Sequence, residues 1–344
     1  MRGPFEIGGF RVPPGTRTTL DLPVSVLSDH TPVSMSVHVV HGRRPGPVLF
    51  VSAAVHGDEV IGVEIARRLL RAPQLDKLAG TLLVIPIVNA FGFMTHSRYL
   101  PDRRDLNRSF PGSEGGSLAG RLAHLFMTEI VERSDLGIDL HSAAIHRTNL
   151  PQIRVSPASD VTLEYADAFG APVVMISKLR DGSLRKAAQE RGVDILLFEG
   201  GEGLRFDELS ARAGVAGILR VMNAKGMVAK RGIAAVREKP VHVRSSSWMR
   251  APAGGLLRTF KATGEYVASG DLLGRISDPF GELRTDIICE TTGIIVGRTN
   301  LPVVHEGDAL FHIAETTGSD VEMRVDTIAS QLDGDPMFDE DEII

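Results

Sequence analysis

Length, composition and charge narrow the classes of protein to which this chain can belong. Its 344 residues exceed the usual size of one domain, so we expect one large and one small domain. Hydrophobic residues make up 43% and charged residues 24%, which is typical of a soluble globular protein. The net charge of -5 offers no basic surface for a nucleic-acid partner.

The location of the protein is predicted from what the sequence lacks. The single cysteine, Cys289, cannot form an internal disulfide, which suits a reducing cytosol. The first residues show no secretory signal, and no apolar run approaches the ~20 residues that span a bilayer. We therefore expect a cytoplasmic protein with no membrane partner, and the sequence leaves open whether it is a homo-oligomer.

Buried strands alternate with helices over roughly residues 1–230. Edge strands are predicted within residues 18–40, and nearly continuous apolar runs predict buried strands at 48–55 and 81–88. A loop with five arginines spans residues 98–121. Further strands are predicted at 136–141 and 193–198, and helices at 59–71, near 117–133, near 160–169, near 181–191 and near 207–226. This order predicts an α/β fold with a mostly parallel mixed sheet flanked by helices.

The pattern changes at about residue 235. Short β-rich runs, interrupted by glycine and proline, predict a small all-β domain, and residues 264–273 resemble residues 301–310 as a two-fold repeat would. From residue 315 onward there are ten acids and one arginine, so we expect the end of this tail to be disordered. The predicted division is a catalytic domain at 1–232, a β domain at 233–316 and an acidic tail at 317–344.

The first candidate metal ligands directly follow the predicted strand 48–55. His56 and Glu59 are separated by two residues at the start of a predicted helix, where a turn can direct both side chains at one ion. Gly57 leaves room for a sharp backbone bend. Alone this signal is weak, because eleven histidines produce about one such match by chance. His312 and Glu315 match too, within the β domain, and we interpret that pair as a chance match.

A second histidine strengthens the hypothesis of a metal site. His141 ends the predicted strand 136–141, and Asp139 lies two residues earlier on the same face, where it can orient the imidazole. Taken alone, His141 is more simply a hydrogen-bonded histidine at a strand end. The segment with His56 and Glu59 and the segment with His141 both lie at strand ends of one predicted sheet. Together they therefore predict a metal site more strongly than either segment does alone.

Glu199 is the candidate general base. It directly follows the predicted strand 193–198 and precedes two glycines, so its carboxylate sits at the exit of a hydrophobic strand. Without a metal site beside it, Glu199 would be interpreted as an ordinary cap or turn residue.

The candidate substrate-binding residues lie in the arginine-rich loop. The guanidinium groups of Arg98 and Arg108 suit two-pronged binding of a carboxylate, and Asn107 adds a donor and an acceptor. The alternative is that they are solvated surface arginines, which is how we interpret Arg103 and Arg104.

Four ordered segments resemble the succinylglutamate desuccinylase/aspartoacylase family, a branch of the zinc carboxypeptidases. They are His56-Gly57-Asp58-Glu59, Asp105 to Gly112, Asp139-Leu140-His141 and Glu199-Gly200-Gly201, and the resemblance covers roughly residues 45–225. The β domain is also similar to that family's C-terminal domain and to biotinyl/lipoyl modules. Those carriers present a lysine between two methionines, and this chain has no such tripeptide, so we do not expect a carrier role.

The resemblance implies a zinc-dependent deacylase with one Zn²⁺ per chain. By position, His56, Glu59 and His141 would be its ligands, Glu199 the base that activates water and Arg98 the oxyanion stabiliser. Asn107 and Arg108 would clamp the carboxylate of a small N-acyl amino acid or related amine. The alternatives are a metallocarboxypeptidase, an esterase for small substrates and a non-catalytic zinc-binding protein. Divalent metals other than zinc also remain open.

Overall fold

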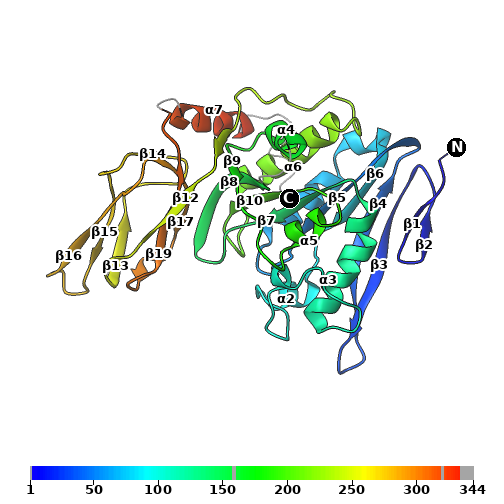
Figure 1. Ribbon diagram of the computed structural model, residues 1–344, viewed down its shortest axis with the longest axis horizontal. Coiled ribbons are helices and arrows are strands. Elements are labelled where there is room, and N and C mark those ends of the chain that lie inside the picture. The colour runs from blue at the N-terminus through cyan, green and yellow to red at the C-terminus, as the bar shows by residue number, and fades with distance from the viewer. Residues whose placement is uncertain (1, 157–159, 319–320, 334–344) are drawn as a thin grey trace.

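One large sheet runs through the molecule (Figure 1). The computed structural model describes residues 2–156, 160–318 and 321–333. The strands of this sheet are β3 (Thr16–Val26), β4 (Pro32–His41), β5 (Arg44–Ala53), β6 (Ala79–Ile85), β7 (Leu136–His141), β8 (Arg147–Val155), β9 (Val173–Ile176), β10 (Ile195–Gly201), β11 (Val241–Val243), β12 (Ser246–Arg250), β14 (Tyr266–Val267), β17 (Gly293–Thr299) and β19 (Ala309–Glu315). Their order is β12-β19-β17-β8-β10-β7-β5-β6-β4-β3; β9 pairs with β8 and β11, and β14 pairs with β17.

The prediction of a mostly parallel sheet holds only in part: the centre is parallel, as are the pairs that β9 forms with β8 and β11. The neighbours β10, β7, β5 and β6 run parallel to one another, whereas β3, β4, β8, β17, β19 and β12 continue the sheet through antiparallel pairs. Helical crossovers join the parallel strands, while a short turn suffices between β3 and β4. The central strands lie between two apolar layers, which explains their nearly continuous hydrophobic sequences.

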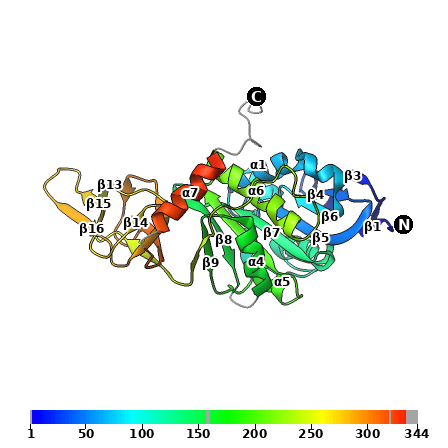
Figure 2. The same cartoon turned by 90° about the horizontal axis from the view of Figure 1, so that it is seen from above.

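Helices cover both faces of the sheet (Figure 2). They are α1 (Ile61–Leu70), α2 (Ala90–Met94), α3 (Leu118–Glu129), α4 (Asp160–Phe169), α5 (Leu184–Gln189), α6 (Glu208–Ala224) and α7 (Val321–Asp333), with 3-10 turns at Pro73–Lys77, Leu106–Arg108 and Val131–Arg133. The alternation of side chains along β5 shows the two layers. Leu49 and Val51 pack with α1, α4 and α6, whereas Phe50 packs with α3 and α5. Among the described residues, no helix is both long and apolar enough to cross a membrane.

The bounds of three predicted elements near the site differ from the structure. The helix predicted at 59–71 begins only at Ile61, so Glu59 lies in the turn before it. The strand β5 ends at Ala53, three residues before His56. The strand β10 extends to Gly201, so Glu199 lies within the strand and not after it.

The C-terminal region is rich in β-strands, as predicted. Besides the strands that join the large sheet, it contains a four-stranded sheet of β13 (Gly255–Thr259), β15 (Leu272–Ser277), β16 (Arg284–Ile288) and β18 (Val303–Val304). The hairpin of β1 (Phe5–Ile7) and β2 (Phe10–Val12) lies at the other end of the chain. Because β17 pairs directly with β8, this β-rich region continues the sheet of the preceding α/β part. The division at residue 232 stays a prediction.

The acidic tail contains one ordered helix among the described residues. Val321, Val325, Ile328 and Leu332 are buried on one side of α7, at a spacing that gives a helix an apolar face. The disorder predicted for the end of the tail falls on residues 334–344, which lie outside the described residues.

Candidate metal centre and active-site cavity

His56 and Glu59 are positioned by a tight turn between β5 and α1. The backbone N–H of Glu59 donates to the carbonyl of His56 over 3.1 Å. The turn packs closely against α2: a Cβ added at Gly57 would lie 2.0 Å from the carbonyl carbon of Gly92. The glycine predicted to allow a bend therefore also allows the close approach of two backbone segments.

His141 and Glu199 face the same edge of the sheet because of strand register. The strands β7 and β10 are parallel, and His141 pairs with Glu199 as the last residue of that ladder. On the other side of β7, Leu140 pairs with Ala53 at the end of β5. Three neighbouring strands thus end together, which brings residues far apart in sequence to one site, as is usual in α/β folds.

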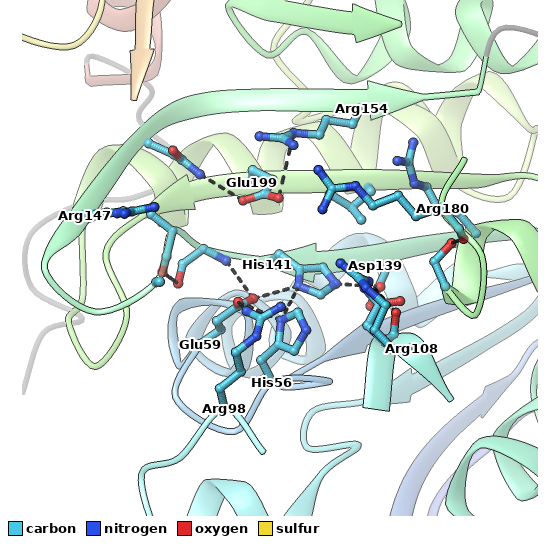
Figure 3. Close-up of a pocket in the computed structure, with 18 of the residues that line it drawn as sticks. His56, Glu59, Arg98, Arg108, Asp139, His141, Arg147, Arg154, Arg180 and Glu199 are labelled. Carbon is cyan, nitrogen blue, oxygen red and sulfur yellow. Dashed lines mark hydrogen bonds and ion pairs between the residues drawn. The ribbon is translucent and has the colours of Figure 1, made fainter. Parts of the chain in front are cut away.

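The side chains of His56, Glu59 and His141 form one buried cluster (Figure 3). Oε1 of Glu59 lies 2.7 Å from Nδ1 of His56, and Oε2 lies 2.7 Å from Nδ1 of His141. The two Nδ1 atoms are 3.2 Å apart. One ligand atom from each residue falls within 4.8 Å of the others, so the three residues could hold a metal ion.

A carboxylate contacts the Nε2 atom of each imidazole, on the side of the ring away from the cluster. Asp139 Oδ2 lies 2.8 Å from Nε2 of His141, and the hydroxyl of Ser52 donates to the other oxygen of Asp139 over 2.7 Å. Asp105 Oδ1 lies 3.2 Å from Nε2 of His56. Carboxylates at both Nε2 atoms favour the tautomers with a proton there, which directs the Nδ1 lone pairs at the centre of the cluster.

Asp105 has a role that the sequence reasoning did not assign. It belongs to one of the four family segments, but nothing in the local pattern links it to His56, 49 residues earlier. Asp139 was found because it shares a strand face with His141. A carboxylate that comes from a separate loop leaves no such periodic signal.

The electrostatics of the cluster favour positive charge between the imidazoles. Burial raises the pKa of Glu59, but the two histidines lower it further, so that the net shift is downward. Burial lowers the pKa of His141, yet Asp139 and Glu59 raise it well above its ordinary value. The pKa of His56 is raised in the same way, against burial, by Glu59 and Asp105. A divalent cation would satisfy these carboxylates as protons do.

Arg98 lies beside the cluster and is paired with two carboxylates. Its Nη1 lies 3.2 Å from Glu59 Oε1, and its Nη2 lies 3.1 Å from Asp105 Oδ2. Burial lowers the pKa of Arg98, but Glu59 and Asp105 raise it more, so the guanidinium stays charged. Arg98, which the family resemblance places at the reacting centre, therefore lies beside the candidate metal ligands.

Asn107 and Arg108 reach the cavity from the 3-10 turn Leu106–Arg108. The side-chain oxygen of Asn107 accepts from the backbone N–H of Leu184 at the start of α5, over 2.9 Å. This bond fixes the amide and directs its remaining N–H group toward other partners. Among the described residues, the guanidinium of Arg108 donates only to the carbonyl of Asn107, over 2.5 Å.

Glu199 faces the same cavity from β10. Asn149 Nδ2 donates to Glu199 Oε2 over 2.9 Å, and Arg154 Nε lies 3.8 Å from Oε1. The glutamate side chain is 17% exposed, so it is accessible to water from the cavity. The structure thus brings Glu199 and the three candidate ligands into one cavity.

The cavity has a volume of about 210 Å³ and is rich in arginine. Besides the predicted residues, its lining includes side chains that the sequence reasoning missed: Arg147, Asn149, Arg154, Arg180, Ser183, Arg185, Leu197 and Trp248. Trp248 lies in β12, so the C-terminal strands contribute to the wall. Burial, reinforced by Arg154, lowers the pKa of Arg185 to about 10. These residues come from β8, β10, β12 and the segment at the start of α5, and only tertiary contacts bring them together, which is why no local motif marks them.

The fold and this cavity define an α/β protein with a candidate mononuclear metal centre at the ends of its parallel strands. The chain belongs to the succinylglutamate desuccinylase/aspartoacylase family: the model of the succinylglutamate desuccinylase/aspartoacylase catalytic domain matches residues 45–224, just over half of the chain. The resemblance seen in the four sequence segments is thereby confirmed.

Individual relatives agree with this assignment. The chain is 28% identical over 315 residues to an N-alpha-acetyl-L-2,4-diaminobutyric acid deacetylase of Halomonas elongata, covering 87% of this chain and 91% of that protein. A succinylglutamate desuccinylase/aspartoacylase of Rhodobacter sphaeroides is 26% identical, with a TM-score of 0.78 over 88% of this chain and 96% of that one. The product-bound ectoine utilization protein of Ruegeria pomeroyi shares the fold, with a TM-score of 0.77, 23% identity, and coverage of 88% and 95%.

Proposed function

We propose that this protein is a zinc-dependent deacylase that hydrolyses the amide bond of a small N-acyl amino acid or related N-acyl amine. One observation carries the proposal: two carboxylate-backed imidazoles and Glu59 converge in a cavity that also contains Glu199 and several arginines. The family and the deacetylase relative support amide hydrolysis as the reaction.

The three candidate ligands fit a catalytic zinc ion. Two imidazole nitrogens and one carboxylate form a donor set that zinc hydrolases use, and three protein ligands leave a position open. The carboxylates behind His56 and His141 hold both rings in the ligating tautomer. When bound, zinc polarises a carbonyl group and makes water acidic enough to serve as a nucleophile near neutral pH.

Glu199 is the proposed general base. Its carboxylate removes a proton from the attacking water and then delivers this proton to the nitrogen of the leaving amine. Asn149 and Arg154 hold the carboxylate in place for both transfers. The products are a carboxylic acid and an amino acid or related amine.

Asn107 and Arg108 are proposed to hold the carboxylate on the amine side of the substrate. Arg108 has its guanidinium in the cavity and no acidic partner among the described residues, so it can form a two-pronged pair with a carboxylate. Arg98 is proposed to stabilise the oxyanion. Nη1 of Arg98 lies 3.2 Å from Glu59 Oε1, beside the candidate ligands, and would donate to the carbonyl oxygen of the substrate, a contact worth about 3–4 kcal/mol in the transition state.

An activity screen with metal analysis tests the proposal. Zinc-loaded protein is assayed on N-acetyl, N-formyl and N-succinyl amino acids, on short peptides and on esters, before and after a chelator. We expect hydrolysis of N-acyl amino acids that a chelator abolishes and zinc restores. Preference for peptides would indicate a carboxypeptidase and preference for esters an esterase. Stoichiometric zinc without hydrolysis would indicate a binding protein.

Replacing the proposed base separates its role from metal binding. In Glu199→Gln we expect zinc to stay bound while kcat falls at least ~100-fold, because the amide cannot accept the water proton. Glu164→Gln, which removes an exposed carboxylate from α4, is the matched control and should keep normal activity. Near-normal turnover in Glu199→Gln would reject the role assigned to Glu199.

A further inference from the structure

The four-stranded sheet exposes apolar side chains on its outer face. Side chains alternate along its strands, so Leu257, Ile276 and Ile287 pack in the core of the β-rich region. On the opposite, outer face, four apolar side chains are between 45% and 55% exposed: Leu256, Phe260, Ile288 and Val303. In the turn between β15 and β16, Phe280 is 83% exposed. Apolar side chains gathered in this way mark a surface that binds a partner.

Three arginines lie among these apolar side chains. Strand pairing places Arg275 between Arg258 and Asp286, and it places Ser277 opposite Arg284. Arg275 and Asp286 form an ion pair over 2.5 Å. Arg258 and Arg284 are exposed and have no acidic partner among the described residues. Like charges directly opposite each other destabilise a sheet, so Arg258 and Arg275 would both gain from a bound anion.

The outer face contains a groove of about 380 Å³. It is lined by residues of β13, β15 and β16 and by Phe260, so it crosses three neighbouring strands. None of the residues that line it belongs to the active-site cavity. A ligand complementary to this groove carries carboxylates for the arginines and apolar groups for the side chains around them.

The segment 334–344 of this chain has the complementary composition. It contains five acids and no basic residue, and four consecutive acids, 339–342, lie between Met337-Phe338 and Ile343-Ile344. The outer face repeats this order along β13, where Arg258 lies between Leu256 and Phe260. Four residues of a strand span about 13 Å, and the five residue steps from Phe338 to Ile343 span at most about 17 Å, so the two patterns match in length.

The helix α7 leads the chain away from the four-stranded sheet. Val321 and Val325 pack with β11 and β17, whereas Ile328 and Leu332 pack in the layer of α1, α4 and α6. Figure 2 shows α7 running from beside β14 toward α6, while β13, β15 and β16 lie at the far end of the molecule. The segment 334–344 follows the end of α7 that is farther from this sheet. The outer face of a second copy is therefore the better placed of the two.

We propose that the segment 334–344 of one copy binds the outer face of the four-stranded sheet of a second copy, which makes the protein a homodimer. The acids 339–342 pair with Arg258, Arg275 and Arg284, and the flanking apolar residues cover the exposed side chains around them. Each copy has one segment and one face, so two equivalent contacts form about a two-fold axis. The second contact forms within the complex, which makes the dimer tighter than one contact alone. This inference does not depend on the deacylase function.

Sedimentation of the full chain over a range of concentrations tests the proposal. We expect a dimer that weakens as salt rises from about 0.1 M to about 1 M, over which the Debye length shrinks from about 10 Å to about 3 Å. In Arg258→Glu with Arg284→Glu, the face variant, the dissociation constant should rise at least ~100-fold, because both contacts become repulsive. Arg11→Glu with Arg43→Glu, exposed arginines outside the β-rich region, is the matched control and should dimerise normally. A wild-type dissociation constant in the face variant overturns the proposal.

Charge reversal in the segment separates lost contacts from misfolding. Asp339→Lys with Asp341→Lys, the segment variant, should also be monomeric. Combining all four substitutions in one chain restores opposite charges, and the dimer should return to within about tenfold of wild type. A misfolded face or segment could not be rescued in this way. A combined variant that stays monomeric, while urea unfolding shows that it is folded, overturns the proposed pairing.

Mixing the two variants separates exchange between copies from binding within one chain. In a heterodimer, the acidic segment of the face variant meets the unchanged arginines of its partner, and the lysine-bearing segment meets the glutamates. We therefore expect a heterodimer from two variants that are each monomeric alone. A labelled peptide of residues 334–344 gives an independent readout by fluorescence anisotropy. A wild type that is monomeric at about 100 µM, where weak dimers still form, overturns the proposal; peptide binding to such a monomer would assign the face to another acidic partner.

Discussion

Asp139 offers the sharpest test of the proposed metal centre. Its Oδ2 lies 2.8 Å from Nε2 of His141, and its Oδ1 accepts from the hydroxyl of Ser52 over 2.7 Å. In Asp139→Asn, the amide oxygen can keep the contact with Ser52 only if the NH₂ group faces His141. That group would donate to Nε2 and move the imidazole proton to Nδ1, the atom that faces the metal cluster.

The expected loss of metal affinity follows from this tautomer change and from the missing negative charge of Asp139. Replacing a carboxylate behind a ligand histidine costs about 10- to 100-fold in metal affinity, or about 1.4–2.7 kcal/mol. Asp139 is fully buried, so we expect the upper end of that range. Asp105→Asn should cost less, because Asp105 is farther from its histidine, at 3.2 Å, and is shared with Arg98.

The assay is a competition between the protein and a chelator of known zinc affinity. Asp194→Asn is the matched control, because Asp194 accepts from the hydroxyl of Thr162 and contacts no candidate ligand. Urea unfolding in the presence of a chelator checks that each variant folds without zinc. A zinc dissociation constant in Asp139→Asn within twofold of wild type, in a folded protein, would refute the orienting role of Asp139.

Two further predictions concern the turn at the site and His312. In Gly57→Ala the new Cβ would lie 2.0 Å from the backbone of Gly92, so we expect a loss of about 1–3 kcal/mol in urea unfolding and weaker zinc binding; unchanged values of both would contradict the close approach. His312, with its pKa lowered to about 3, must stay neutral in the folded protein, whereas it takes up a proton near pH 6.5 when unfolded. Its contribution to stability is therefore complete above about pH 6.5 and is lost as the pH falls toward 3, by about 2 kcal/mol at pH 5. His312→Phe should reduce this loss between pH 8 and 5 in unfolding titrations, and an unchanged acid dependence would show that His312 is not buried neutral.

The sequence alone predicted the candidate metal ligands, the candidate base and most of the elements on which they lie. Apolar runs predict buried strands, and polar residues at or just after the ends of such runs are candidates for a functional site. His56, Glu59, His141 and Glu199 could be singled out in this way, because each signal is local. Asp139 was found from a period of two along a strand, which is also local.

Tertiary structure decided what closes the cavity and what supports the ligands. Asp105 reaches His56 from a separate loop, and Trp248 reaches Arg147 from the other end of the chain. The parallel centre of the sheet could be predicted, but its antiparallel continuation through β8 and β17 could not. Strand alternation and helical periodicity record which face of an element is buried, and they contain no information about which distant element will cover that face.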